Sequence, residues 1–134
     1  MPGYAVKTVV PVSKTRSEIE QLVMKRGALD YTTHSEAKGA MIAFSLKDRR
    51  IVFRLPFPKP DNAQDVRSRW RGLLLTIKAK FESIDRGVET FDQAFLAHVM
   101  TDDGRTIGWH AEGQMKQIIA NKVPLLPPPG NADV

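Results

Sequence analysis

The feature that most constrains this 134-residue chain is a long amphipathic pattern over residues 61–86. Apolar residues recur there at helical spacing and form one stripe: Val66, Trp70, Leu73, Leu74, Ile77, Phe81 and Ile84. Asp61-x-x-Gln64 is predicted to cap this helix, and Gly87 is predicted to end it. A helix of this length must bury its stripe against a second layer, so the sequence must supply one.

Three short strands predicted before the helix provide that layer. Residues 39–46 and 49–55 predict two strands whose side chains alternate between two faces, with Lys47 and Asp48 as the turn between them. Residues 28–33 show a weaker alternation and predict a third strand. The alternation predicts one apolar face, formed by Ile42, Phe44, Leu46, Ile51, Phe53 and Leu55. The opposite face is mixed and is open to solvent, an interface or a ligand: Met41, Ala43, Ser45, Arg50, Val52 and Arg54. We expect the long helix to pack on the apolar face.

Shorter elements are predicted on the N-terminal side of this core. Residues 5–12 are rich in β-branched side chains and predict a first strand that ends at Pro11. Thr15-x-x-Glu18 has the pattern of a capping box, and it predicts a helix over residues 15–26 that stops at Gly27.

Two further helices are predicted on the C-terminal side. Thr90-x-x-Gln93 predicts the start of a short helix. A last helix is expected over residues 107–120, with three residues directed inward: Met115, Ile118 and Ile119. The sequence offers no place for Trp109 in this scheme.

The order of elements predicts the fold class. A strand, a helix, three strands, a long helix and small helices indicate an α+β two-layer domain, with an antiparallel sheet of three to four strands packed by the long central helix. Residues 1–123 are expected to form this single domain, and residues 124–134 a proline-rich tail. The helix, three strands and helix follow the order of double-stranded-RNA-binding domains, but the Gly- and His-containing loop of those domains is missing.

Composition excludes several classes of protein. The chain has no cysteine, which removes disulfides, thiolate metal sites and cysteine nucleophiles. No apolar run approaches the roughly 20 residues of a membrane span, and the N-terminus lacks the pattern of a signal peptide. We therefore expect a cytoplasmic protein that makes no membrane contact, and homo-oligomerisation is left open.

No pattern for catalysis, metal binding or a cofactor is present. His34, His98 and His110 have no ligand spacing, and Asp102-Asp103 beside Gly104 indicates a turn rather than a carboxylate pair for a metal. We therefore expect no cofactor and a non-enzymatic protein, although catalytic groups that are distant in sequence would escape this test.

Charge is the one functional signal in the composition. Residues 49–86 hold ten Lys and Arg against four Asp and Glu, a net charge of +6, whereas residues 87–134 carry −3. A basic centre predicts contact with a polyanion, and eight residues are its candidates: Arg49, Arg50, Arg54, Arg67, Arg69, Arg71, Lys78 and Lys80. The alternative is that the cations lie on both flanks of a buried helix, where their apolar stems cover the helix and their charged ends stay in water.

Three stretches resemble a family of small phage- and prophage-encoded proteins. Residues 10–27 resemble the opening of that family, residues 69–82 (RWRGLLLTIKAKFE) its long-helix run, and residues 90–109 (TFDQAFLAHVMTDDGRTIGW), with the later PLLPPP, its C-terminal run. The resemblance implies a phage protein acting in the host cytoplasm.

Together, these signals predict a phage accessory protein that contacts DNA or RNA through a basic sheet and long helix, in phage DNA replication, recombination or regulation. The alternative is an anti-defence protein that inhibits a host immune effector by protein–protein binding.

Overall fold

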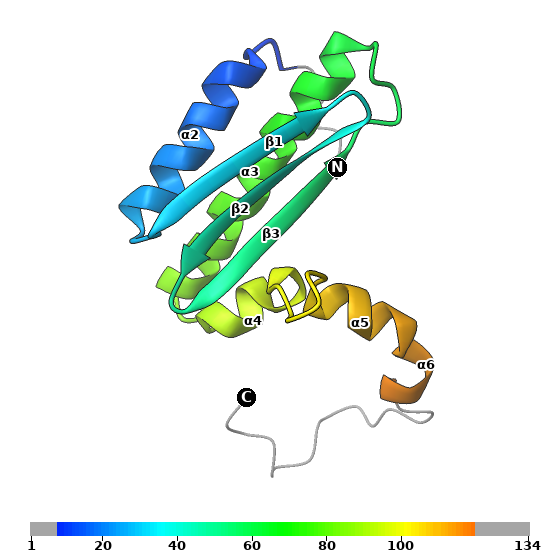
Figure 1. The fold of residues 1–134 in the computed structure, drawn as a ribbon. Coiled ribbons are helices and arrows are strands. Elements are labelled where there is room, and N and C mark those ends of the chain that lie inside the picture. The colour runs from blue at the N-terminus through cyan, green and yellow to red at the C-terminus, as the bar shows by residue number, and fades with distance from the viewer. Residues whose placement is uncertain (1–7, 120–134) are drawn as a thin grey trace.

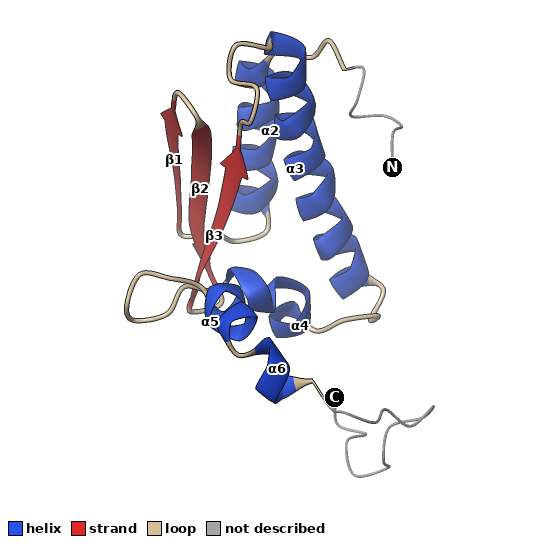
Figure 2. Cartoon of the chain, turned by 90° about the vertical axis from the view of Figure 1, so that its right-hand side faces the viewer, coloured by secondary structure: helices blue, strands red, loops and turns tan. Residues whose placement is uncertain are grey.

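The computed structural model describes residues 8–119, in which two long helices cover one face of a three-stranded antiparallel sheet (Figures 1 and 2). The predicted α+β fold class is confirmed. The proline-rich tail at 124–134, with its predicted boundary to the domain, lies outside the described residues. The elements are α2 (Val12–Lys25), β1 (Asp30–Glu36), β2 (Gly39–Leu46), β3 (Arg49–Pro56), α3 (Ala63–Asp85), α4 (Phe91–Phe95), the 3₁₀ helix η1 (Leu96–His98), α5 (Ile107–Gly113) and α6 (Met115–Ile118).

The start of the chain differs from its prediction. Residues 8–11 are not in a strand and α2 begins at Val12, so the predicted strand over 5–12 is wrong for residues 8–12, while residues 5–7 lie outside the described range. Pro11 is the N-cap residue of α2. A proline beside the first helical turn has no N–H to satisfy, and this backbone effect overrides the β propensity of the neighbouring valines.

The predicted capping box of the first helix is also wrong. Thr15 lies inside α2, where it is completely buried, and its hydroxyl caps no backbone N–H. Glu18 instead pairs with a residue of α3. The helix ends where Gly27 takes a left-handed φ of 100°, which confirms the predicted stop.

The sheet follows its predicted alternation. Strands pair in the order β1-β2-β3, with Ile42 opposite Phe53 and Phe44 opposite Ile51 on the buried face. Lys47 and Asp48 both have positive φ values (51° and 60°), as a two-residue type I′ hairpin requires. β1 begins at residue 30 and continues to residue 36, later than the predicted range of 28–33.

The long helix packs as its stripe predicts. Its main inward residues are buried with the apolar face of the sheet: Trp70, Leu73, Leu74, Ile77 and Phe81. The cap differs by one residue, because the side chain of Asn62, rather than Asp61, accepts a hydrogen bond from the N–H of Asp65. Gly87 has a φ of 72° just beyond the helix, so the predicted stop is confirmed.

The short helix α4 closes the lower end of the core in Figure 1. Both hydrogen bonds of the Thr90–Gln93 capping box form, as predicted. Phe95 is fully buried at its end. Four aromatic rings surround it at centroid distances of 5.1 to 6.3 Å: Phe44, Phe53, Phe81 and Phe91. This residue therefore ties the C-terminal part of the chain to both layers.

The last predicted helix, over residues 107–120, is wrong as a single element. It divides at Gln114 into α5 and α6, and residue 120 lies outside the described range. Met115, Ile118 and Ile119 are 42, 59 and 56% exposed rather than buried, because α6 projects away from the sheet and its covering helices (Figure 1). Within residues 8–119, no helix has the length and apolar character to cross a lipid bilayer.

Candidate functional site

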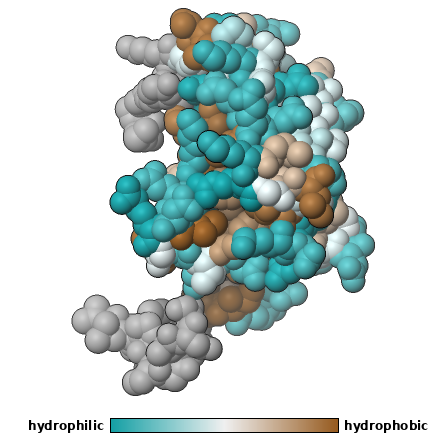
Figure 3. Space-filling view, turned by 90° about the vertical axis from the view of Figure 1, so that its left-hand side faces the viewer, coloured by the Kyte–Doolittle hydropathy of each residue, from teal (hydrophilic) through white to brown (hydrophobic). Residues whose placement is uncertain are grey.

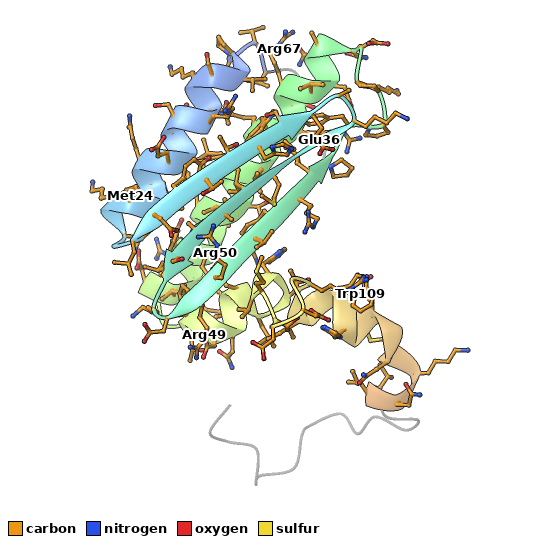
Figure 4. The ribbon with its side chains drawn as sticks, viewed as in Figure 1. Met24, Glu36, Arg49, Arg50, Arg67 and Trp109 are labelled. Carbon is orange, nitrogen blue, oxygen red and sulfur yellow. The ribbon has the colours of Figure 1, made fainter. Side chains whose placement is uncertain are left out.

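The predicted basic residues do not form one patch. Figure 4 shows Arg50 on the sheet face that carries no helix, Arg49 at the lower end beside α4, and Arg67 at the opposite end of the molecule. The candidates therefore lie in separate surroundings.

Two of the eight hold the fold together. Arg71 of α3 is 8% exposed, and its Nη1 donates to Glu18 Oε1 of α2 at 2.7 Å. Lys80 donates from Nζ to the Ala94 carbonyl oxygen at 2.7 Å, at the end of α4. Because these two side chains lie on opposite flanks of α3, they join it to a different neighbour on each side.

Two others are bound to carboxylates at the sheet. Arg49 makes a bidentate pair with Asp92, with both nitrogen–oxygen distances at 3.1 Å. Arg50 donates from Nη1 to Asp30 Oδ1 at 2.6 Å and to the Ser45 hydroxyl at 3.0 Å. A phosphate would have to displace a carboxylate at either position.

The first turns of α3 contain two more paired cations. Arg67 donates to Gln64 Oε1 at 2.8 Å. Arg69 donates from Nε to Asp65 Oδ2 at 2.9 Å, one helical turn earlier. The Asp65 carboxylate balances the charge of Arg69, whereas the Gln64 amide is neutral and only occupies a donor of Arg67.

Arg54 and Lys78 are the candidates with exposed side chains that make no hydrogen bond or ion pair with residues 8–119. Lys78 lies in the helical layer, where it lines a surface hollow with Leu22 of α2 and with Arg26, the C-cap residue of that helix. Arg54 lies on the mixed face of β3, opposite Met41 of β2. These two cations thus lie on different layers of the molecule. Seen from the α2 side, the surface is largely hydrophilic with separate apolar patches (Figure 3).

Arg54 lies between two hollows on the open sheet face. The first, which we call the β3–α5 cleft, has a volume of about 730 Å³ and lies between β3, η1 and α5. The second, which we call the sheet-end hollow, has a volume of about 350 Å³ and includes His34, Met41 and Pro56. Arg54 lines both hollows and lies between them on the open face, and we call the two hollows together the groove.

The wall of the β3–α5 cleft depends on a hairpin-like segment. The Met100 N–H donates to the Arg50 carbonyl oxygen at 2.8 Å, which attaches the segment to the edge of β3, and Thr101 N–H donates to the Arg105 carbonyl oxygen at 2.7 Å across the turn. Gly108 then brings α5 against η1: a Cβ at this position would lie 2.7 Å from the carbonyl oxygen of Ala97. Glycine is needed here because the two backbones approach so closely.

An arginine and a tryptophan stand at the α5 side of the cleft. The guanidinium carbon of Arg105 lies 3.8 Å from the ring centroid of Trp109, which is a close cation–π contact. His110 packs edge-on against the same ring at 5.0 Å and 89°. Trp109 is nevertheless 52% exposed, so its ring is held in place while much of it faces solvent.

Two titratable residues, His98 and Asp103, also line the cleft. Burial, with the nearby positive charge of Lys80, lowers the pKa of His98, whose ring stacks on Phe53 at 4.0 Å. Hydrogen bonds from the Thr101 hydroxyl and the Arg105 N–H lower the pKa of Asp103 to about 2. Asp103 therefore stays ionised and serves the turn, as its position beside Gly104 predicts.

Sequence reasoning named Arg54 but missed the rest of this cleft. Arg105 and Trp109 have the i, i+4 spacing that brings side chains together on a helix face, which is a weak signal because Arg105 precedes α5. No group of three or more His, Cys, Asp or Glu in the described part of the chain is arranged to hold a metal ion.

The groove is thus the feature of the structure that best indicates a function. Comparison of the chain with models of protein families, with curated proteins and with solved structures finds no match.

Proposed function

We propose that this protein is a non-enzymatic phage accessory protein of the host cytoplasm that binds nucleic acid through the open face of its sheet. The observation that carries the proposal is Arg54, an exposed arginine that makes no hydrogen bond or ion pair with residues 8–119 and lies in the middle of a groove. Arginine matches the geometry of a phosphate with a rigid fork of donors. The phage setting rests on the family resemblance, and replication, recombination or regulation of phage DNA are the processes it would serve.

The sheet face is a better candidate than the long helix. On α3, Arg71 and Lys80 are committed to neighbouring elements, and Arg69 is committed to a carboxylate. An arginine that leaves a carboxylate for a phosphate exchanges one ionic contact for another, so its net contribution to affinity is small. Arg54 loses no such contact on binding.

The small number of cations that line the groove also limits the salt dependence of binding. Arg54 and the solvent-facing Arg105 are the two arginines of the groove, and each neutralised phosphate on a single strand contributes about −0.7 to the slope of log K against log salt. The expected slope is therefore about −1.4. A slope several times steeper would require the paired arginines to take part.

Fluorescence anisotropy with labelled oligonucleotides, between about 50 and 200 mM salt, tests the proposal. Arg54→Gln should weaken binding and flatten the slope by about 0.7. Lys78→Gln is the matched control, because it removes the same charge from an exposed side chain of the helical layer, and it should leave binding unchanged. Weakening by Lys78→Gln alone would move the interface to the long helix. No binding to any oligonucleotide at the lowest salt would refute the proposal.

The second candidate is inhibition of a host defence protein. The observation that favours it is a group of exposed apolar residues on α5, on α6 and at the C-cap of α6: Trp109, Met115, Ile118 and Ile119. Exposed apolar surface of this kind marks interaction sites in many proteins. Ile118→Glu combined with Ile119→Glu should then abolish capture of the defence protein, and sedimentation of the same variant would detect self-association through these residues.

A further inference from the structure

We infer that the β3–α5 cleft holds one unpaired nucleotide, with its base against the ring of Trp109 and its phosphate at Arg54. This inference rests on the proposed function and narrows it to single-stranded nucleic acid. The volume of about 730 Å³ falls within the range of sites for small organic ligands. The chemistry of three walls then selects the ligand.

The first wall offers a flat stacking surface. Arg105 at 3.8 Å and His110 at 5.0 Å fix the orientation of the Trp109 ring before any ligand binds. Nucleobases stack on aromatic rings and on arginine guanidinium planes, and every base has a suitable face. Because the ring is already held, little side-chain freedom is lost when a base binds.

The second wall supplies positive charge at the opposite side of the cleft. Arg54 comes from β3, whereas Trp109 comes from α5, and both line the same cleft. A ligand that uses both groups must carry an aromatic ring and an anion, which describes a nucleotide. An uncharged aromatic compound would leave the guanidinium of Arg54 without a partner, and inorganic phosphate would leave the ring unused.

The third wall contains a carboxylate with capacity to accept a hydrogen bond. Asp103 is already committed to Thr101, Arg105 and His110. Glu112 also lines the cleft, is exposed, and makes no hydrogen bond or ion pair with the rest of the described chain. A carboxylate at a base edge accepts from an exocyclic amino group, such as N4 of cytosine. The cleft therefore favours an amino-bearing base over thymine or uracil.

The groove explains why a single strand would be preferred. A base inside a duplex is stacked and paired, so it cannot lie against Trp109 without leaving the helix. In a single strand, the neighbouring nucleotides can follow the groove past Arg54 into the sheet-end hollow, because that residue lines both spaces.

Emission from Trp109 gives a direct readout of this site. The other tryptophan, Trp70, is 1% exposed in the core, so quenching by acrylamide reports mainly on Trp109. Binding of an oligocytidine strand should protect Trp109 from acrylamide. An abasic strand of the same length should bind more weakly and give no protection.

Trp109→Ala should weaken binding of the oligocytidine strand by about 5- to 150-fold, the range that base–aromatic stacking supplies. Affinity for the abasic strand should not change. Leu96→Ala is the control, since it truncates a side chain that is also exposed but does not line the cleft, and it should have no effect. Glu112→Gln should reduce the preference for cytosine over thymine.

The possible failures are distinguishable. Equal affinity for abasic and cytidine strands, or an unchanged affinity in Trp109→Ala, overturns the nucleotide site, while salt-dependent binding that still requires Arg54 leaves the proposed function standing. If no oligonucleotide binds but cytidine monophosphate protects Trp109 from acrylamide, the cleft assignment holds and the proposed function fails. Loss of both signals refutes both.

Discussion

Replacement of Gly108 by alanine gives a sharp test of how α5 sits in the fold. The new Cβ would lie 2.7 Å from the Ala97 carbonyl oxygen and 3.1 Å from the Ala97 Cβ. Cβ atoms essentially never approach another heavy atom closer than 3.0 Å. Both contacts are with backbone or with the first side-chain carbon, so no rotation relieves them and α5 must move away from η1.

Two opposing effects determine the size of the change. Alanine in place of glycine inside a helix stabilises by about 0.8–1 kcal/mol, while an added methyl group in a tightly packed place costs about 1–3 kcal/mol. Gly72→Ala isolates the first effect, because Gly72 lies within α3 and its added Cβ would meet no atom within 4 Å. The difference between the two variants should therefore be about 1–3 kcal/mol.

Urea unfolding at 25 °C, followed by far-ultraviolet circular dichroism, measures both variants. Gly72→Ala should raise the midpoint and Gly108→Ala should fall below it by about 0.5–2 M urea. Acrylamide quenching of Trp109 should also change in Gly108→Ala, because the wall of the β3–α5 cleft moves. Equal stabilisation by both substitutions would show that α5 does not pack against η1, and the cleft as described would not exist.

Three other predictions concern the core and its charges. Phe95→Ala should lower the free energy of unfolding, measured with urea, by about 3–5 kcal/mol, because the ring is fully buried among four aromatic neighbours. A loss below about 1 kcal/mol would show that α4 is not part of the core. Arg71→Gln should lower the melting temperature while Lys78→Gln leaves it unchanged, because only Arg71 is a buried ion-pair partner, and equal effects would contradict the structural role of Arg71. The lowered pKa of His98 means that its contribution to stability is complete above the ordinary value of about 6.5 and is lost as the pH falls below it, since the unfolded state takes up the proton first. His98→Phe keeps a ring against Phe53, so its melting temperature should fall less between pH 7 and pH 5 than that of the unsubstituted protein, and an equal fall would show that His98 is not the group responsible.

Local patterns in the sequence predicted much of the fold. The stripe of α3 identified Trp70 and Phe81 as core residues, because at 3.6 residues per turn the apolar residues of the stripe all fall on one face of the helix. The hairpin at Lys47–Asp48 and the capping box at Thr90 were equally visible, since each depends on residues within four positions of one another. In contrast, Thr15 has the pattern of a cap, but Pro11 is the N-cap of α2 and Thr15 is buried inside that helix.

The sequence by itself determined where charge and apolar surface occur along the chain, and therefore which layers form. Only the tertiary structure decided which charges remain available. Arg71 meets Glu18 across 53 positions, Arg49 meets Asp92 across 43, and Arg50 meets Asp30 across 20. Such pairs depend on how layers come together, which no local pattern encodes. The same packing left Arg54 free in a groove and brought it to the same cleft as Trp109, because β3 and α5 become neighbours only when the chain folds.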